Sequence, residues 1–174
     1  MLTPQQANSV YSSLREKIVE HTFLSQLMRE MWNRGFYTLE VSRAESDSFG
    51  YDVVFEHGPV VRHIQLKSKS ERRPQKVSVS KTLALKPSGC VVAIVLTGNM
   101  EIERFYWFGN APGQPLPALS GFKPTKKLRR DREGKKPPRQ NHVDVPISRF
   151  SEVPDIAALI GRLFGTLAST KKIA

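Results

Sequence analysis

The chain has 174 residues and a formal net charge of +11 at pH 7, with 39% hydrophobic and 25% charged residues. A chain of this length and composition is expected to form one globular domain with a substantial core. Its charge favours a polyanionic partner. Because no basic amphipathic helix is evident, nucleic acid is a better candidate than a membrane surface.

Several classes of protein are disfavoured by the sequence. No stretch is long and apolar enough to span a bilayer, and MLTPQQANSV lacks the pattern of a signal sequence, so we expect a cytoplasmic protein with no membrane partner. The single cysteine, Cys90, begins the apolar run CVVAIVL, which favours a buried hydrophobe over a nucleophile. One cysteine and four scattered histidines give no spacing for structural zinc.

Residues 1 to 34 have helical periodicity. Two apolar stripes are offset by roughly a quarter turn on a helical wheel, which predicts a bend or break near residues 18 to 21. Gly35 is expected to act as the C-terminal cap. The first stripe contains Val10, Tyr11, Leu14 and Ile18, and the second contains Phe23, Leu24, Leu27, Met28, Met31 and Trp32.

The next segments are rich in strand-forming residues. FYTLEVSRA, YDVVF and VVRHIQLKS are predicted strands separated by the turn sequences SDSFG and EHGP. CVVAIVLTGNMEIERFYWFG is predicted to form a hairpin with a Gly-Asn turn. The segment SVSKTLALKPSG between them is ambiguous, and Ser80 could cap a short helix that ends before Pro87.

The last third of the chain begins with a proline-rich segment, NAPGQPLPALSGF, and a basic segment, KPTKKLRRDREGKKPPRQ. A short strand, HVDVPI, and a helix with Pro154 in its first turn are predicted to follow. These elements predict a single mixed α/β domain with a central sheet covered by helices. Its parts are a helical region (residues 1 to 34), a sheet core (36 to 108), a proline-rich and basic loop (110 to 141) and a C-terminal helix (154 to 168).

Polar residues interrupt two strands that otherwise have a buried character. In HIQLK, side chains alternate, so Gln65 and Lys67 share one strand face. If the Gly58-Pro59 turn pairs this strand with the preceding one, Asp52 reaches the same end of the sheet. An edge strand with its polar residues in water is the alternative, but it accounts poorly for an acid that opens an apolar run.

Glu20 is a further candidate because it falls on the apolar face of the second helical stripe. A buried carboxylate is costly unless a cation meets it, so Glu20 is a candidate functional residue beside Asp52 and Lys67. Alternatively, Glu20 lies at the solvated end of the stripe or interacts with the helix dipole. Asp47 in ESDSFGYD is interpreted as a turn residue and is a reserve ligand.

The order of these motifs resembles the PD-(D/E)xK nuclease superfamily. The resemblance covers about residues 16 to 98 and is carried by EHTFLSQLMREMWNRGFYTLEV, then GYD, then QLK. It is closest to the Mrr-like and archaeal Holliday-junction-resolvase-like branches, in which Gln replaces the second acid. The chain departs from the pattern at Tyr51, where the superfamily has proline before the acid.

This resemblance implies a restriction-endonuclease-like, three-layer α/β fold and an endonuclease that uses Mg²⁺ or Mn²⁺ to hydrolyse phosphodiester bonds, with DNA as the expected substrate. It makes Asp52 the metal-binding acid, Gln65 the occupant of the second-acid position, Lys67 the catalytic lysine and Glu20 the helical carboxylate that completes the metal site. It also implies a homodimer. Because Gln65 is neutral, a catalytically inactive nucleic-acid-binding protein of the same fold is the main alternative. A basic protein-interaction module is the third.

Basic residues are concentrated late in the chain. Residues 123 to 139 contain nine Lys or Arg and two acids, so this segment carries about +7 of the net +11. We expect a loop, flexible without ligand, that clamps nucleic acid beside the site, although such runs are often only solvated loops. The expected nucleic-acid-binding residues are Lys69, Arg72, Arg73, Lys123, Lys126, Lys127, Arg129, Arg130, Arg132, Lys135, Lys136 and Arg139.

Overall fold

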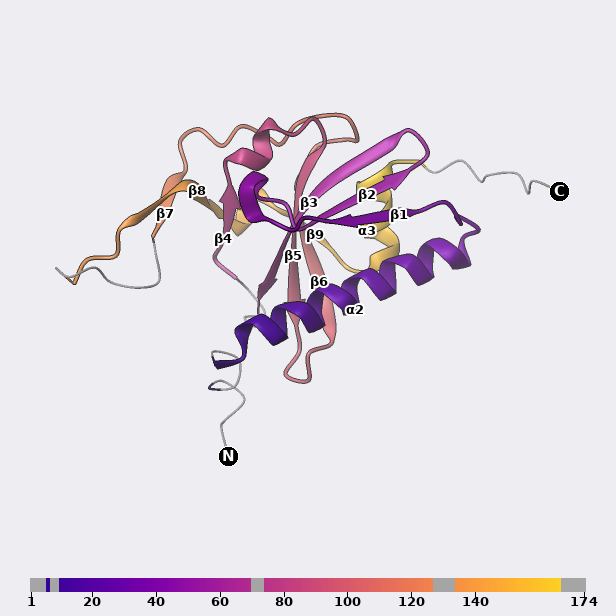
Figure 1. The fold of residues 1–174 in the computed structure, drawn as a ribbon, viewed down its shortest axis with the longest axis horizontal. Helices are drawn as coiled ribbons and strands as arrows, with labels where there is room; N and C mark the ends of the chain where they lie inside the picture. Colours follow the sequence, from indigo (N-terminus) through magenta and orange to yellow (C-terminus); the bar gives the residue numbers. More distant parts are fainter. Residues whose placement is uncertain (1–5, 7–9, 70–73, 127–133, 167–174) are drawn as a thin grey trace.

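The computed structural model describes residues 6, 10–69, 74–126 and 134–166. Within these residues the strands form a six-stranded central sheet, in the order β1-β2-β3-β5-β6-β9, and a three-stranded sheet, in the order β4-β8-β7 (Figure 1). β3 and β5 are parallel and the other central pairs are antiparallel, so the central sheet is mixed. The predicted mixed α/β fold is confirmed.

The elements have the following bounds. The central strands are β1 (Glu40–Arg43), β2 (Val53–His57), β3 (Val60–Lys69), β5 (Gly89–Leu96), β6 (Ile102–Gly109) and β9 (Ser151–Val153). The smaller sheet contains β4 (Lys76–Ser80), β7 (Lys123–Lys126) and β8 (Pro138–Pro146). The helices are α2 (Ser12–Asn33) and α3 (Ile156–Phe164), with short 3-10 helices η1 (Asp47–Phe49), η2 (Thr82–Leu85) and η3 (Ile147–Arg149).

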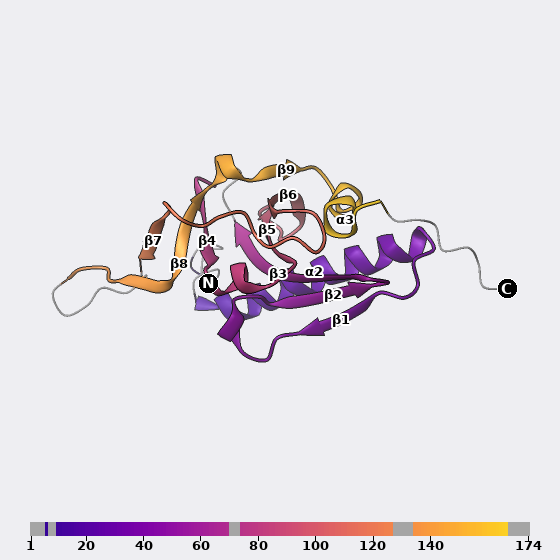
Figure 2. The same cartoon turned by 90° about the horizontal axis from the view of Figure 1, so that it is seen from above.

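The two faces of the central sheet carry different layers. α2 and α3 pack on one face, where Phe23, Leu27 and Leu163 meet Val53 and Ile64 of the sheet. The smaller sheet and η2 cover the other face, where Val77 and Val79 of β4 pack against alternate residues of β5. Figure 2 shows the smaller sheet projecting at the end of the molecule opposite α3. Both of the described α-helices therefore share one face, and strands form the third layer.

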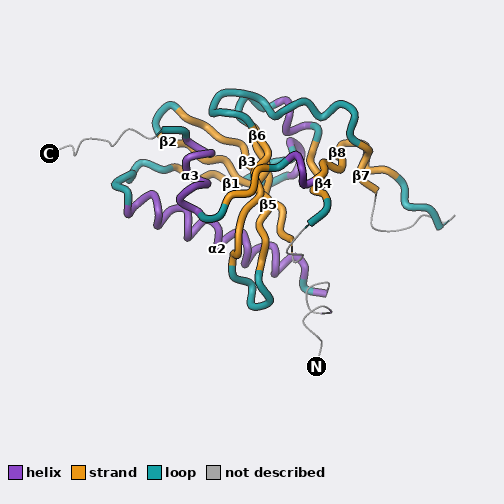
Figure 3. The backbone as a smooth tube through the Cα atoms, turned by 180° about the vertical axis from the view of Figure 1, so that it is seen from behind, coloured by secondary structure: helices purple, strands orange, loops and turns teal. Residues whose placement is uncertain are grey.

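β5 lies between these two layers. All eight of its residues are buried, which accounts for its uninterrupted apolar sequence. Cys90 is fully buried, and burial raises the pKa of its thiol to about 12, so the prediction that it is a buried hydrophobe is confirmed. The predicted β5–β6 hairpin is also confirmed, and its turn extends past α2 in the view from behind (Figure 3).

The N-terminal helix was predicted to bend or break near residues 18 to 21; a break is wrong, because α2 is continuous there. The helix can remain continuous since one side of it packs on the sheet, through Val19 and four residues of the second stripe: Phe23, Leu24, Leu27 and Met31. The other two residues of that stripe, Met28 and Trp32, are exposed. The first stripe is exposed and makes no demand on the path of the helix. Gly35 has a φ of 82°, a left-handed conformation that suits the predicted cap.

Other boundaries also differ from the predictions. Ser80 ends β4, and its hydroxyl bonds the Thr82 hydroxyl at 2.8 Å, whereas the residue that precedes η2 is Lys81. Pro154 lies before α3, because Asp155 is the N-cap and accepts a hydrogen bond from the Ala158 amide at 2.7 Å. The sequence did not predict β9.

The segment predicted as a loop from 110 to 141 contains strand structure. β7 and the first residues of β8 lie within it and pair antiparallel. Pairing satisfies the backbone groups that a long surface loop would leave to water. The basic segment is therefore partly a β-hairpin attached to β4, and residues 127 to 133 between its strands lie outside the described part of the chain.

Candidate active site

Asp52 occupies the point at which β2 and β3 begin to pair. Its amide donates to the Ile64 carbonyl at 2.9 Å, and its carboxylate Oδ2 accepts the Leu66 amide at 2.7 Å. The side chain thus continues the ladder beyond Val53, the first paired residue of β2. This accounts for an acid at the start of an apolar strand, and it fixes the carboxylate at the end of the sheet.

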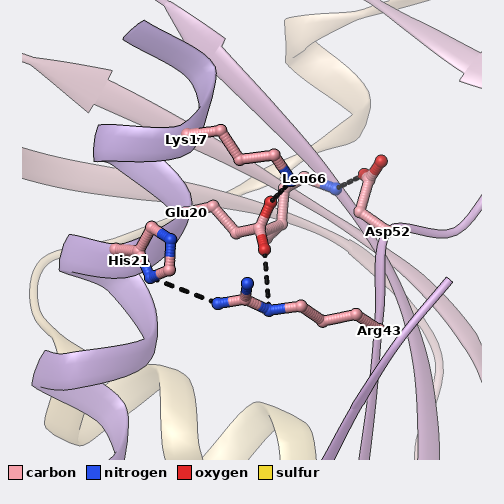
Figure 4. A network of polar contacts seen from close by, with 6 residues as sticks. All are labelled: Lys17, Glu20, His21, Arg43, Asp52 and Leu66. Carbon is pink, nitrogen blue, oxygen red and sulfur yellow. Dashed lines mark hydrogen bonds and ion pairs between the residues drawn. The ribbon is translucent and has the colours of Figure 1, made fainter. Parts of the chain in front are cut away.

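Glu20 extends from α2 toward the same end of the sheet. Its Oε1 lies 3.1 Å from Arg43 Nε and its Oε2 lies 3.3 Å from Lys17 Nζ, with 14% of the side chain exposed (Figure 4). Arg43 also contacts His21 Nδ1 at 3.2 Å. Glu20 Oε1 is buried, and within the described residues its contact with Arg43 is an ion pair without hydrogen-bond geometry. Glu20 is therefore not at the solvated end of its stripe.

A cavity of about 580 Å³ lies between the first half of α2 and the sheet, and Glu20, Asp52 and Lys67 all line it. A smaller cavity of about 220 Å³ shares Glu20 and Asp52 with it. Three of the four predicted catalytic residues thus meet at one site. The full lining of the larger cavity is Ser13, Glu16, Lys17, Val19, Glu20, Asp52, Leu66, Lys67, Ser68 and Ile94.

Glu16 is a residue that the sequence interpretation missed. It lines the larger cavity one helical turn before Glu20. Residues four apart lie on the same side of a helix, so the spacing from Glu20 was the available signal. Glu16 adds a third carboxylate to the cavity wall, on the side where α2 begins.

Gln65 is not brought into this group. It lies on the face of β3 that β4 covers, is 1% exposed, and its Oε1 accepts the Ser80 amide at 3.2 Å. Gln65 does not line either of the two cavities described. This geometry does not support the predicted role of Gln65 as a metal ligand, because the amide oxygen instead joins β3 to β4. Gly50 also packs closely against β4, since a Cβ on Gly50 would lie 2.2 Å from Ser80 Cβ.

Asp47, the reserve ligand, begins η1, which agrees with its interpretation as a turn residue. Its side chain lies outside the described part of the structure. Six of the predicted nucleic-acid-binding residues also lie outside it: Arg72, Arg73, Lys127, Arg129, Arg130 and Arg132.

Of the six described residues in the predicted nucleic-acid-binding set, five lie on or just before strands of the smaller sheet. Lys123 and Lys126 lie on β7, Arg139 lies on β8, and Lys135 and Lys136 precede β8; all five are exposed. Lys69 ends β3, two residues beyond Lys67. The hairpin therefore presents its charge to solvent.

Asp144 connects the hairpin of β7 and β8 to β4. Its carboxylate accepts the Thr125 hydroxyl at 2.8 Å and pairs with Lys76, so one side chain links β7, β8 and β4. Burial alone would raise the pKa of Asp144, but the hydrogen bonds from Lys76 and Thr125 and the charges of Lys76 and Lys69 lower it overall.

The larger cavity has carboxylates that could bind a divalent metal ion, but no preformed cage for one among the described residues. No three His, Cys, Asp or Glu side chains converge into a preformed site within the described residues. Mg²⁺ nevertheless needs only one or two protein carboxylates, since waters and substrate phosphate complete its octahedron. Glu20 and Asp52 both line the larger cavity and carry hard oxygen atoms that could bind such an ion, and the buried Glu20 Oε1 would become accessible if Arg43 moved aside. The residues therefore fit a hydrated ion rather than an enclosed one.

Comparisons with known proteins give a structural likeness. No family model matches the chain, and no curated protein matches it significantly. A solved structure of Hjc, a Holliday junction resolvase from the archaeal hyperthermophile Archaeoglobus fulgidus, is 15% identical, covers 78% of this chain and 97% of its own, and has a TM-score of 0.38. A likeness at this level does not define a function. No described helix is long and apolar enough to cross a membrane.

We expect Glu20→Gln to weaken metal affinity by roughly tenfold or more, because the amide retains the shape but not the charge of a hard oxygen ligand. Calorimetric titration of Mn²⁺ measures the effect. Glu30→Gln is the matched control, since Glu30 is another α2 carboxylate in an ion pair, with Arg34 at 2.8 Å, but lines neither cavity described. Equal affinities for the Glu20 and Glu30 variants would remove Glu20 from the metal site.

Proposed function

We propose that this protein is a nuclease that hydrolyses phosphodiester bonds, with DNA as its substrate and Mg²⁺ or Mn²⁺ as its cofactor. The observation that carries the proposal is the meeting of Glu20, Asp52 and Lys67 around one cavity. These side chains come from three separate segments of the chain. Carboxylates beside an ammonium match the needs of phosphodiester cleavage, in which a cation is held while negative charge develops on phosphate.

Each residue has a distinct task in this proposal. Asp52, held by the Leu66 amide, and Glu20 would bind the ion, which when bound lowers the pKa of a coordinated water and offsets charge on the phosphate. Lys67 orients the attacking water or stabilises the charge that develops on the phosphate oxygens. Gln65 has no ligand role here, because its amide oxygen is bound to the Ser80 amide.

Arg43 and Lys17 define a metal-free arrangement of the site. Both cations pair with Glu20 in this structure, so its charge is already compensated. A bound ion would compete with Arg43 for the Glu20 carboxylate. Arg43, once released, would remain at the smaller cavity as a cation for phosphate, because it lines that cavity together with Asp52.

We expect nucleic-acid affinity to depend strongly on salt. If about five basic side chains meet phosphates, log K should fall with log salt at a slope of about −4.5. Replacing Lys126, Lys127, Arg129 and Arg130 with Ala should flatten the slope by several units and weaken binding to all sequences alike. Fluorescence anisotropy across a salt series measures this. An unchanged slope would show that the hairpin does not contact the backbone, and no salt-dependent affinity at all would favour a protein-interaction module.

The activity itself is tested by incubating labelled duplex, single-stranded and branched DNA, and matching RNA, with the purified protein. Cleavage in Mg²⁺ or Mn²⁺ that stops when a chelator is added supports the proposal. Salt-dependent binding without cleavage of any substrate would contradict it.

That second outcome describes the alternative function, a nucleic-acid-binding protein that has lost catalysis. Two observations favour it. Gln65 supplies no ligand to the cavity, and Arg43 with Lys17 already neutralises Glu20 without an ion. The assay distinguishes the two functions because a nuclease yields cleaved product that a chelator abolishes, whereas a binding protein yields no cleaved product with or without the chelator.

A further inference from the structure

The outer side of α2 is unusually apolar for a solvent-exposed helix surface. Its inner side packs on the sheet, and a helix of this kind normally carries polar residues opposite its buried stripe. Here large hydrophobic side chains lie on the outer side and are 43% to 65% exposed. The exposed hydrophobic residues are Tyr11, Leu14, Ile18, Met28 and Trp32, and we call the row they form with the exposed polar residues His21 and Ser25 the outer stripe.

The outer stripe has coiled-coil spacing. Its residues follow one another in alternate steps of three and four, from Tyr11, the N-cap residue that precedes α2, to Trp32 near the end of the helix. This is the repeat that keeps one seam facing a partner helix. Scattered exposed hydrophobic residues are normal on a protein surface, but a regular row along a 22-residue helix is typical of helix–helix contact.

From Leu14 to Trp32, the order of residues in the outer stripe is symmetric. Leu14 and Ile18 precede the polar pair His21 and Ser25, and Met28 and Trp32 follow it, whereas Tyr11 lies beyond this symmetric part. In an antiparallel pair of such helices, Leu14 would face Trp32 of the other copy, Ile18 would face Met28, and His21 would face Ser25. Apolar residues then meet apolar residues, and the imidazole meets a hydroxyl that can bond it. A two-fold symmetric interface requires this self-complementarity.

We propose that a second copy of this chain packs against the outer stripe, so that two α2 helices cross antiparallel about a two-fold axis that passes midway between His21 and Ser25. The end of the seam is preformed, because the Trp32 ring makes an edge contact with exposed Tyr37, with centroids 4.7 Å apart. None of the outer-stripe residues lines either cavity described, so the pairing leaves both cavities open. It does not depend on nuclease activity.

The arrangement has a consequence for a nucleic acid. Glu20 lies three residues from the centre of the outer stripe, or about 4.5 Å along the helix axis. The larger cavity of one copy and the larger cavity of the other copy would therefore lie on either side of the two-fold axis. If the chain is a nuclease, the dimer would act on two phosphodiester bonds of the same substrate.

Charge substitutions within the outer stripe test the proposal. Ile18→Glu or Met28→Lys alone should weaken dimerisation by at least about tenfold, because each buries a charge opposite an apolar residue. The double variant should restore dimerisation, because each Glu then faces a Lys of the other copy. Both positions are exposed, so the fold should tolerate the changes. Leu85→Glu, at an exposed apolar residue on η2, is the matched control.

Sedimentation equilibrium of the whole chain, from about 1 to about 100 μM, reads out these changes. A wild-type protein that stays monomeric throughout would overturn the proposal. Dimerisation that is unaffected by the single variants would also overturn it, by placing the interface elsewhere.

Cysteine cross-linking tests the orientation. Chains with Ile18→Cys mixed with chains carrying Met28→Cys should form disulfide-linked dimers, whereas Ile18→Cys chains alone should not, since a disulfide needs Cα atoms within about 7 Å. The native Cys90 is buried and does not interfere. Cross-linking of Ile18→Cys chains with themselves would indicate a parallel pair and contradict the symmetric arrangement.

Discussion

Asp52→Asn should reduce cleavage on the order of a thousandfold and remove most of the metal affinity. Asn keeps a carbonyl oxygen that can accept the Leu66 amide, so the start of the β2–β3 ladder should survive. What it loses is the charge that binds the ion. The expected loss is therefore functional and not a loss of folding, which circular dichroism can verify alongside calorimetric titration of Mn²⁺.

Lys67→Ala should separate binding from chemistry. We expect turnover to fall by roughly a hundredfold or more while metal affinity is unchanged, because the ammonium acts on the water or phosphate and not on the ion. Lys81→Ala, an exposed lysine that lines neither cavity described, is the control. Cleavage at the wild-type rate by both the Asp52 and Lys67 variants would show that this cavity is not the active site.

Arg62→Ala should cost about 3 to 5 kcal/mol in the free energy of unfolding, the largest stability effect that we expect from an exchange of one side chain. Arg62 is fully buried, and burial lowers the pKa of its guanidinium. It stacks over the Trp107 ring at 5.1 Å, and its hydrogen-bond acceptors among the described residues are neutral oxygens. These are the carbonyls of Leu163 at 2.7 Å, Arg162 and Asn110 at 2.8 Å and Ala111 at 3.3 Å, and the Ser88 hydroxyl at 3.2 Å.

The cost arises because Arg62 joins the end of α3 to the sheet. The last carbonyls of a helix have no partner within it, and Arg62 satisfies two of them in α3. Alanine would leave these groups buried without donors and would add a cavity beside Trp107. Urea unfolding measures the effect, with exposed Arg149→Ala as the control. A cost below about 1 kcal/mol would mean that water replaces the guanidinium.

Arg62 also shows where sequence interpretation fails. Under the edge-strand alternative Arg62 would be a polar residue in water, whereas its partners lie up to 101 residues away in the chain. No local pattern encodes such contacts. The first helical stripe is a similar case. Apolar periodicity predicts that a helix face is buried, but it does not show whether that face packs in the core of its own chain or against another molecule.

The strands were easier to predict because their signals are local. The apolar run of β5 and the Gly-Asn turn define the hairpin within one segment. Alternation also placed Gln65 and Lys67 on one strand face. It could not reveal that β4 would cover Gln65 and take its amide oxygen, because β4 comes from a segment with mixed helix and strand signals.

A metal ion held by Glu20 and Asp52 is central to the proposed nuclease activity. Anomalous diffraction from crystals grown with Mn²⁺ and uncleaved DNA tests its presence most directly. We expect a single strong peak in the larger cavity within about 2.2 Å of an oxygen of each carboxylate, with Arg43 moved away from Glu20. A cavity without such a peak, in which Glu20 still pairs with Arg43 while DNA is bound, would contradict the nuclease proposal.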